Sequence, residues 1–293
     1  MTVQWLPYRL TYRNGLINTA LLAPLRRVGL RARLKALAEA PDTVTMVIGI
    51  RNRNDYRLRN ALWSLSNQDY PGELTRIVVV DYGSDEDRRR QAFALCERFN
   101  AETVSVPAPV WSRSKCLNYA IKRADTKFLL STDADVIFPP HYLSEMVAAL
   151  KAEPLSVIYS RVMDLSENST GELHAIAEQD LPIPFQALIE QATARSAGHE
   201  NAGINGSYTL FYQHIHGYDE FFEGWGSEDY DLMRRFQRLG LDVRSISAKA
   251  SYLHQWHPKG EGIADFSEAA RRNREYYESN KSIFRNKPRW GEG

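Results

Sequence analysis

Apolar positions from residue 43 onward follow two alternating patterns. Short apolar runs bounded by polar turns predict strands at 43–50, 76–81 and 102–107, and at "FLLST" within 127–140. Between these runs, apolar residues recur every three or four positions, as at Leu58, Leu62 and Leu65, which predicts helices. Strands that alternate with helices favour an α/β fold with a central, mostly parallel sheet flanked by helices.

The second half of the chain is less regular. Residues 165–205 are polar and punctuated by proline and glycine, and we expect them to form an irregular or small helical excursion over the sheet. A clear helix follows at 228–239, with Gly240 as its stop. The segment "DVRSISAKASYL" (242–253) predicts a strand, and 264–285 predicts a charged helical tail.

The composition is that of an ordinary soluble protein. Of 293 residues, 43% are hydrophobic and 25% are charged, which is enough to bury a substantial core. The formal net charge of +1 gives no field that would make nucleic acid the main partner. Cys96 and Cys116 lie in helical apolar patterns, which argues against a disulfide framework or a cysteine metal site. No apolar run approaches the roughly 20 residues that span a bilayer, and no signal peptide is evident, so we expect a cytoplasmic protein.

Residues 1–42 form a basic, amphipathic N-terminal extension. Up to residue 40 it contains seven basic residues and a single acid, Glu39, with Trp5 and several leucines interspersed. Such a segment can lie on an anionic membrane surface or on a partner, which would make the protein peripheral to the inner face of the membrane. It can equally pack on its own domain with its arginines solvated. The sequence leaves both interpretations open.

Polar clusters follow three of the predicted strands, at the edge where an open α/β sheet binds its ligands. They are Arg51-Asn52-Arg53, Asp81-Tyr82-Gly83-Ser84 and Asp133-Ala134-Asp135. An Asp-x-Asp is common by chance, but this one follows a buried strand, so both carboxylates project from a rigid strand end. Hard carboxylate oxygens suit Mg²⁺ or Mn²⁺ holding a phosphate. From these residues alone, a metal site and an acidic turn are equally open.

Two histidines, His254 and His257, follow another predicted strand beside Gly260 and Gly262. Imidazoles three residues apart can converge on one cation, and a mixed oxygen and nitrogen shell favours Mn²⁺ over Mg²⁺. The bland alternative is a structural role for each histidine.

The stretch "EGWGSEDYDL" (223–232) has a structural and a catalytic interpretation. Glu228 and Asp229 occupy the first turn of the predicted helix, with Ser227 as N-cap, where acids stabilise the helix dipole. That does not explain Trp225, a large flat ring between two glycines, which could stack on a sugar. A carboxylate beside it could accept a proton from a sugar hydroxyl, and the helix N-terminus would lower its pKa and keep it ionised.

Five segments appear in an order and spacing that resemble a known family: "IGIRNRNDYRLRNAL", "WSRSKCLNYAI", "FLLSTDADVIF", "INGSYTLFYQHIHGYDEFFEGWGSEDYDLMRRF" and "YLHQWH". The chain resembles metal-dependent GT-A glycosyltransferases of family 2, with motifs similar to those of β-1,4-galactosyltransferases and bacterial chondroitin-polymerase-like enzymes. The resemblance covers about residues 43–260. It implies a Rossmann-like catalytic domain at 43–263, with a nucleotide-binding half at 43–140 and an acceptor-binding half at 141–263, before a tail at 264–293.

The resemblance also implies roles for individual residues. Asp135, His257 and His254 would bind the metal, and Asp81 would contact the nucleotide base. Asp229 would be the catalytic base, and Glu228 would be the second catalytic residue. The remaining donor contacts would come from Ile50, Arg51, Asn52, Arg53, Arg113, Lys115, Asp133, Ala134, Trp225 and Gly226. The acceptor contacts would come from Glu228, Trp225 and Asn205. Two departures, Gly49 for a usual proline and Tyr82 for a usual second acid, leave the identity of the donor base less certain.

The expected reaction is an inverting transfer from a nucleotide-sugar donor, a UDP-sugar by resemblance, to a hydroxyl of a glycan or glycolipid acceptor, with Mn²⁺ or Mg²⁺ as cofactor. A sugar nucleotidyltransferase also binds its metal with acids at the end of a strand, but "GIRNRND" lacks the glycines of the phosphate-binding loop of that class. A glycan-binding domain without turnover is the third possibility. The released product distinguishes the three functions. A glycosyltransferase releases a nucleoside diphosphate, a nucleotidyltransferase releases pyrophosphate, and a binding domain releases neither.

Overall fold

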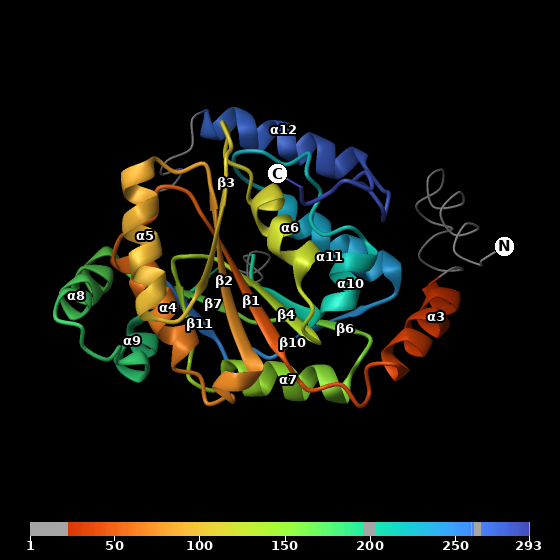
Figure 1. The fold of residues 1–293 in the computed structure, drawn as a ribbon, viewed down its shortest axis with the longest axis horizontal. Coiled ribbons are helices and arrows are strands. Elements are labelled where there is room, and N and C mark those ends of the chain that lie inside the picture. The colour runs from red at the N-terminus through yellow and green to blue at the C-terminus, as the bar shows by residue number, and fades with distance from the viewer. Residues whose placement is uncertain (1–22, 196–202, 259, 261–264, 293) are drawn as a thin grey trace.

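A computed structural model describes residues 23–195, 203–258, 260 and 265–292 (Figure 1). Its centre is a seven-stranded sheet in which β9 is antiparallel to its neighbours β4 and β6 and every other pair is parallel. The strands, in order across the sheet, are β10 (Asp242–Ser245), β6 (Ser156–Tyr159), β9 (Asn205–Tyr208), β4 (Phe128–Thr132), β1 (Val44–Ile50), β2 (Thr75–Tyr82) and β3 (Glu102–Val106). The predicted α/β class with a mostly parallel sheet is confirmed.

The chain order across this sheet creates a crevice. From β1 the chain proceeds outward through β2 to β3, then returns to β4 on the other side of β1. The connections diverge between β1 and β4, and ligands of open α/β sheets bind at such a point beyond the carboxyl ends of the strands. Arg51 follows β1 there and Asp133 follows β4.

Helices cover both faces of the sheet, as Figure 1 shows. On one side lie α4 (Tyr56–Ser66) and α5 (Glu86–Arg98), with α8 (Glu167–Glu178) and α9 (Phe185–Gln191) outside them. On the other side lie α6 (Arg113–Arg123), α10 (Thr209–His214) and α11 (Glu228–Leu239). The remaining described helices are α7 (Tyr142–Ala152), which packs on β6 and β9, α3 (Ala23–Lys35), α12 (Phe266–Ser279), and a 3₁₀ turn, Gly72–Leu74.

Side-chain caps fix where two of the helices at the crevice begin. Asp55 accepts a hydrogen bond from the main-chain N–H of Arg57 at the start of α4, and Ser112 accepts one from Lys115 at the start of α6. Both helices bury apolar stripes against the sheet, including Leu58, Leu62 and Leu65 as predicted.

A second, smaller sheet has the order β5 (Val136–Ile137), β11 (Tyr252–His254), β7 (Val162–Asp164) and β8 (Thr193–Ala194). In its register His254 lies opposite Val136 on one side and Asp164 on the other. Segments distant in sequence therefore meet beside the Asp-x-Asp, because Val136 directly follows Asp135.

This second sheet corrects one prediction. Residues 242–253 are not one strand, because β10 pairs with β6 in the large sheet and β11 pairs with β5 and β7 in the small one. The described part of the excursion at 165–205 contains the helices α8 and α9, which bury Leu173 and Leu188, and it also contains the short strand β8. Residues 196–202 lie outside the described residues.

Gly49 has a packing reason. A Cβ at this position would lie 2.8 Å from Sγ of Cys116, because α6 approaches β1 closely here. The site of the unusual glycine is therefore a tight contact between strand and helix, and any side chain at this position would push them apart.

The described part of the N-terminal extension packs on its own domain. Arg27 donates to the main-chain oxygen of Gly240 at 2.7 Å, at the end of α11, and pairs with Asp242 at 3.1 Å. Leu30 is buried in the main core. Residues 1–22 of the extension, with most of its interspersed apolar residues, lie outside the described residues. In the part of the chain that the structure describes, no helix is both long and apolar enough to cross a bilayer.

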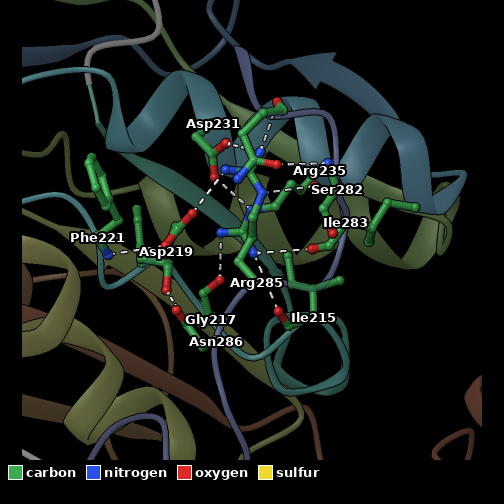
Figure 2. Close-up of polar contacts among 12 residues, drawn as sticks. Ile215, Gly217, Asp219, Phe221, Asp231, Arg235, Ser282, Ile283, Arg285 and Asn286 are labelled. Carbon is green, nitrogen blue, oxygen red and sulfur yellow. Dashed lines mark hydrogen bonds and ion pairs between the residues drawn. The ribbon is translucent and has the colours of Figure 1, made fainter. Parts of the chain in front are cut away.

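The C-terminal segment is tied to α11 by a buried ion-pair network, shown in Figure 2. Arg285 pairs with Asp219 at 2.9 Å and with Asp231 at 2.8 Å, and Asp231 also pairs with Arg235 at 2.7 Å. Side chains in these pairs are at most 4% exposed. Ile283 lies in the main hydrophobic core, so the predicted tail is an integral part of that core.

Breaking this network should cost much of the protein's stability. Asp231→Ala would leave two buried guanidinium groups short of one counter-charge, which should lower the free energy of unfolding by about 3–5 kcal/mol. Glu278→Ala removes an exposed helix pair with Arg274 and should change it by less than about 1 kcal/mol. Urea denaturation of both variants checks this, and equal effects would contradict it.

Candidate functional site

The acids of the Asp-x-Asp and of α11 meet at one arginine. Arg113, the first residue of α6, donates from Nε to Asp133 at 2.6 Å and from Nη1 to Asp229 at 2.7 Å. Its Nη2 donates to the main-chain oxygen of Gly203 at 3.2 Å, and its side chain is only 11% exposed. The fold thus brings together Arg113 and Asp133, both predicted to contact the donor, and Asp229, the predicted catalytic base.

Gly203 allows the backbone to approach these groups. Its φ is +79°, and a Cβ there would lie 3.1 Å from Oδ2 of both Asp133 and Asp229. A side chain would be strained at that φ and would crowd both carboxylates. Nothing in the sequence marks this glycine, because its neighbours at the site come from distant segments.

The prediction that the helix N-terminus lowers the pKa of Asp229 is wrong. Burial raises the pKa of Asp229 to about 8, and the charges of Glu228 and Asp133 add to the rise while Arg113 opposes it. Burial likewise raises the pKa of Glu228, which is 8% exposed. Ser227 is at the N-cap position, but its φ is +74° and its side chain makes no capping hydrogen bond. Loss of hydration and acid crowding therefore outweigh the helix dipole.

Asp135, His254 and His257 converge into one cluster of candidate metal ligands. Ligand atoms of the three residues all lie within 4.8 Å of one another, and Nε2 of His257 is 3.4 Å from Oδ2 of Asp135. The hydrogen bond to Asp135 raises the pKa of His257. Although burial raises the pKa of Asp135, the hydrogen bond to His257 and the neighbouring positive charges hold it well below its usual range. One carboxylate and two imidazoles form a donor set that suits Mn²⁺.

Contacts at Nδ1 orient both imidazoles. Nδ1 of His254 lies 3.1 Å from Asp164, and Nδ1 of His257 lies 3.0 Å from the main-chain oxygen of Pro258. Arg195 binds both carboxylate oxygens of Asp164 in turn. Metal-binding histidines commonly have such a partner at the other ring nitrogen. Sequence spacing could not identify Asp164 or Arg195, because only the pairing of β7 with β11 brings them here.

The segment after β1 connects two strand-end loops. Asn52, with φ +53°, donates its main-chain N–H to Ser84 at 2.7 Å and accepts from the N–H of Asp85 at 2.8 Å. The side chain of Ile50 is 1% exposed, so only its main chain can meet a ligand. The loops after β1 and β2 therefore form one connected wall.

Arginines flank this wall. Arg51 donates to the main-chain oxygen of Pro109 at 3.1 Å, and Arg53 pairs with Asp55 at 2.9 Å. Asp55 also binds Arg57 at 2.8 Å, and the charge of Arg53 acts on Asp135. Arg57 was not singled out from the sequence as a residue of this region, because it lies within a predicted helix.

Asp81, the predicted base contact, is fully buried. Its Oδ2 lies 3.4 Å from the hydroxyl of Ser105, and its Oδ1 has no hydrogen-bond partner among the described residues. A buried carboxylate oxygen without a donor is uncommon and marks a place for one. Tyr82, in place of the usual second acid, is 4% exposed and lies edge-on to Trp111.

The remaining predicted contacts divide between the surface and the layer beneath it. Trp225 is 47% exposed, next to Gly226, whose φ is +97°. Lys115 pairs with Glu223 at 2.6 Å, so it reaches the loop that carries Trp225. Ala134 is 8% exposed, between the two acids.

Asn205, predicted to touch the acceptor, instead lies beneath the site. It is 1% exposed, its Nδ2 donates to Gly203 and Tyr218, and its Oδ1 accepts from Tyr212. Its amide is used in supporting Gly203, because β9 places it inside the sheet rather than at its edge.

Two family models match the chain. Glycosyl transferase family 2 matches residues 45–216, which is more than half of the chain, and the N-terminal domain of galactosyltransferase matches residues 184–258. The second match contains the Gly-Trp-Gly segment, the acids that follow it and both histidines.

Curated relatives are similar over part of their length. Mouse chondroitin sulfate N-acetylgalactosaminyltransferase 1 is 25% identical over 153 residues, covering 51% of this chain and 28% of the relative. Mouse chondroitin sulfate N-acetylgalactosaminyltransferase 2 is 26% identical over 169 residues, covering 57% and 28%. The chain thus spans little more than a quarter of the length of these relatives.

Solved structures share the fold. S. aureus TarS 1–349 in complex with UDP-GlcNAc matches with a TM-score of 0.53 at 16% identity, covering 78% of this chain and 64% of that one. GalNAc-T7 with UDP, GalNAc and Mn²⁺ matches with a TM-score of 0.54 at 12% identity, covering 76% and 45%. The family match favours a glycosyltransferase over the nucleotidyltransferase that the sequence left open. The chain belongs to glycosyltransferase family 2, and it has the GT-A fold.

Proposed function

We propose that the chain is a metal-dependent, inverting glycosyltransferase that moves a sugar from a UDP-sugar to a hydroxyl of a glycan or glycolipid. The observation that carries the proposal is the contact of Arg113 with both Asp133 and Asp229, which puts the candidate base beside a candidate donor contact. The matched structures with UDP, UDP-GlcNAc and Mn²⁺ support a UDP-sugar donor and a divalent cation.

Asp229 is the general base in this proposal. Its carboxylate accepts the proton of the acceptor hydroxyl while that oxygen forms a bond to the anomeric carbon. The bond from the anomeric carbon to the diphosphate oxygen breaks on the opposite face, so the configuration inverts. A raised pKa suits this role, because the group must end the step protonated.

Asp135, His254 and His257 fit a divalent cation, since both imidazoles are oriented from Nδ1 and both are near the carboxylate. When bound, such a cation would neutralise negative charge on the departing diphosphate. Arg51 and Arg53 flank the wall that the loops after β1 and β2 form, and they would add positive charge near the departing diphosphate. The free Oδ1 of Asp81 would accept an N–H of the uracil, once the pocket around it opens. Trp225 would cover the donor.

Metal binding should depend on the three ligands. Asp135→Asn and His257→Ala should each weaken Mn²⁺ binding by at least about 10-fold, and Asp164→Asn by about 10–100-fold, because it orients His254. His174→Ala, on the exposed face of α8, is the matched control. Calorimetric titration of Mn²⁺ and of UDP with Mn²⁺ or with EDTA measures this. UDP binding that is equally tight with EDTA would contradict a metal-assisted donor site.

Removing the base should separate binding from transfer. Asp229→Asn should lower kcat by about 10²–10⁴-fold, because the amide cannot accept the acceptor's proton. UDP binding should stay within about 2-fold of wild type, since Arg113 keeps Asp133 as a partner. Release of UDP from a panel of UDP-sugars, together with UDP titration, tests this. Loss of UDP binding in the variant would assign Asp229 to the donor pocket instead.

The pH dependence follows from the raised pKa of Asp229. In the free protein, kcat/KM for the acceptor should rise as the pH rises through about 8, where the carboxyl loses its proton. The same shift stabilises the fold fully below the ordinary pKa of aspartate, and this contribution is lost as the pH rises through 8. Asp229→Asn should therefore lose less unfolding free energy than wild type between about pH 5 and pH 9. A pH–rate profile and urea denaturation at both pH values check the two signs.

A further inference from the structure

The loop at 223–227, which we call the Trp225 loop, makes contacts both with the start of α6 and with α12, which lies outside the two matched family segments. It leads directly into Glu228 and Asp229 at the start of α11. Three of its residues have positive φ: Gly224 at +73°, Gly226 at +97° and Ser227 at +74°. Glycines at such positions leave a free loop with many accessible conformations, so neighbouring contacts must select one of them.

One set of contacts comes from the start of α6. The N–H of Gly224 donates to the main-chain oxygen of Trp111 at 2.9 Å, and Lys115 pairs with Glu223 at 2.6 Å. These contacts belong to the nucleotide-binding side of the cleft, and they fix only the beginning of the loop.

The second set comes from α12. Nδ2 of Asn273 donates to the main-chain oxygens of Glu223 and Trp225, both at 3.0 Å. These two carbonyls flank Gly224, so one amide group bridges the turn. Asn273 is 1% exposed and is the residue that α12 buries. The ring of Phe266, at the start of α12, lies 4.7 Å from that of Trp225.

The amide suits this position for a chemical reason. Two hydrogens on one nitrogen can reach two carbonyls at once, whereas serine has one hydrogen to donate and an ionised aspartate has none. Arg272 also donates to the main-chain oxygen of Glu223, at 3.1 Å, so loss of the amide would leave the oxygen of Trp225 without this donor. That loss costs free energy, and the loop would move to satisfy the oxygen.

Helix α12 is itself anchored at its other end. Tyr276 donates to Asp219 at 2.9 Å, and Arg285 joins Asp219 to Asp231 of α11 in the buried network of Figure 2. Helix α11, which carries Asp229 in its first turn, therefore also holds the C-terminal segment. That segment includes α12, which contacts the Trp225 loop. Helix, loop and C-terminal segment form a closed ring of contacts.

We infer that Asn273 is a positioning residue that sets the Trp225 loop over the cleft for sugar transfer. This inference rests on the proposed function, because the loop would cover the donor and lead to the base. Its consequence is that the C-terminal helix, beyond residue 258 where the family match ends, is part of the transfer machinery rather than an appendage.

Asn273→Asp in the full-length protein is the main test. It keeps the size of the side chain and replaces the donor amide by an oxygen facing two carbonyls. Amide hydrogen exchange of the peptide containing 223–227 should accelerate by about 10-fold or more, while β4 peptides stay unchanged. Transfer kcat should fall by about 10–100-fold, with hydrolysis of the donor rising relative to transfer, and UDP binding with Mn²⁺ should stay within about 2-fold.

Two further variants keep the test decisive. Arg274→Ala alters the next residue of α12, an exposed partner of Glu278, and should leave loop exchange and transfer as in wild type. Phe266→Ala removes only the ring beside Trp225, so it reports on the loop even where Asn273→Asp does not fold; it should raise the acceptor KM by about 10-fold while kcat changes less.

The outcomes separate the two claims. Unchanged exchange at 223–227, or faster exchange with wild-type transfer, would overturn the positioning role of Asn273. A wild-type protein that transfers no sugar from any UDP-sugar would overturn the proposed function instead, and hydrogen exchange would still decide whether Asn273 fixes the loop.

Discussion

Three carboxylates lie around one largely buried guanidinium, and the site depends on the balance between their negative charges and its positive charge. Asp133, Glu228 and Asp229 come from two distant segments, and their negative charges would repel one another where burial weakens hydration. Arg113 compensates them by pairing directly with Asp133 and Asp229, which also fixes the distance between β4 and the start of α11. Burial is the main cause of the raised pKa of Asp229, and the charges of Glu228 and Asp133, which Arg113 only partly offsets, add to it. A carboxylate with such a pKa can take up a proton near neutral pH.

The small sheet solves a different problem, because it assembles the candidate metal ligands. Asp135 precedes β5 and His254 ends β11, and the pairing of these strands brings the carboxylate and the imidazole together. β7 adds Asp164 from the other side of β11 and orients His254. The candidate ligands thus rest on main-chain hydrogen bonds of a sheet, and the Asn273 contacts give the Trp225 loop a comparable support from α12.

Local signals predicted the elements well where periodicity and stop residues agreed. The helix predicted at 228–239 is α11 with the same bounds, and Gly240 ends it with φ +106°. The strands predicted at 43–50, 76–81, 102–107 and "FLLST" are found to within about one residue at each end, and the Asp-x-Asp follows a strand as predicted. The prediction of one strand at 242–253 was wrong, because the segment contains two strands that belong to different sheets. The pattern of apolar residues indicates which positions are buried, but it does not indicate which strand pairs with which. Prediction was also wrong about the pKa of Asp229, because the dipole argument is local and the burial is not.

The sequence by itself determined the α/β class, the family, and which residue types stand at the strand ends, since all of these depend on order and spacing along the chain. Only the tertiary structure decided that Arg113 bridges Asp133 and Asp229, that Asp164 orients His254, that Asn205 supports the site from below, and that Asn273 grips the Trp225 loop. Each of these depends on contacts between segments far apart in the chain. Electrostatic compensation and hydrogen-bond satisfaction act through space, so spacing along one sequence carries no record of them.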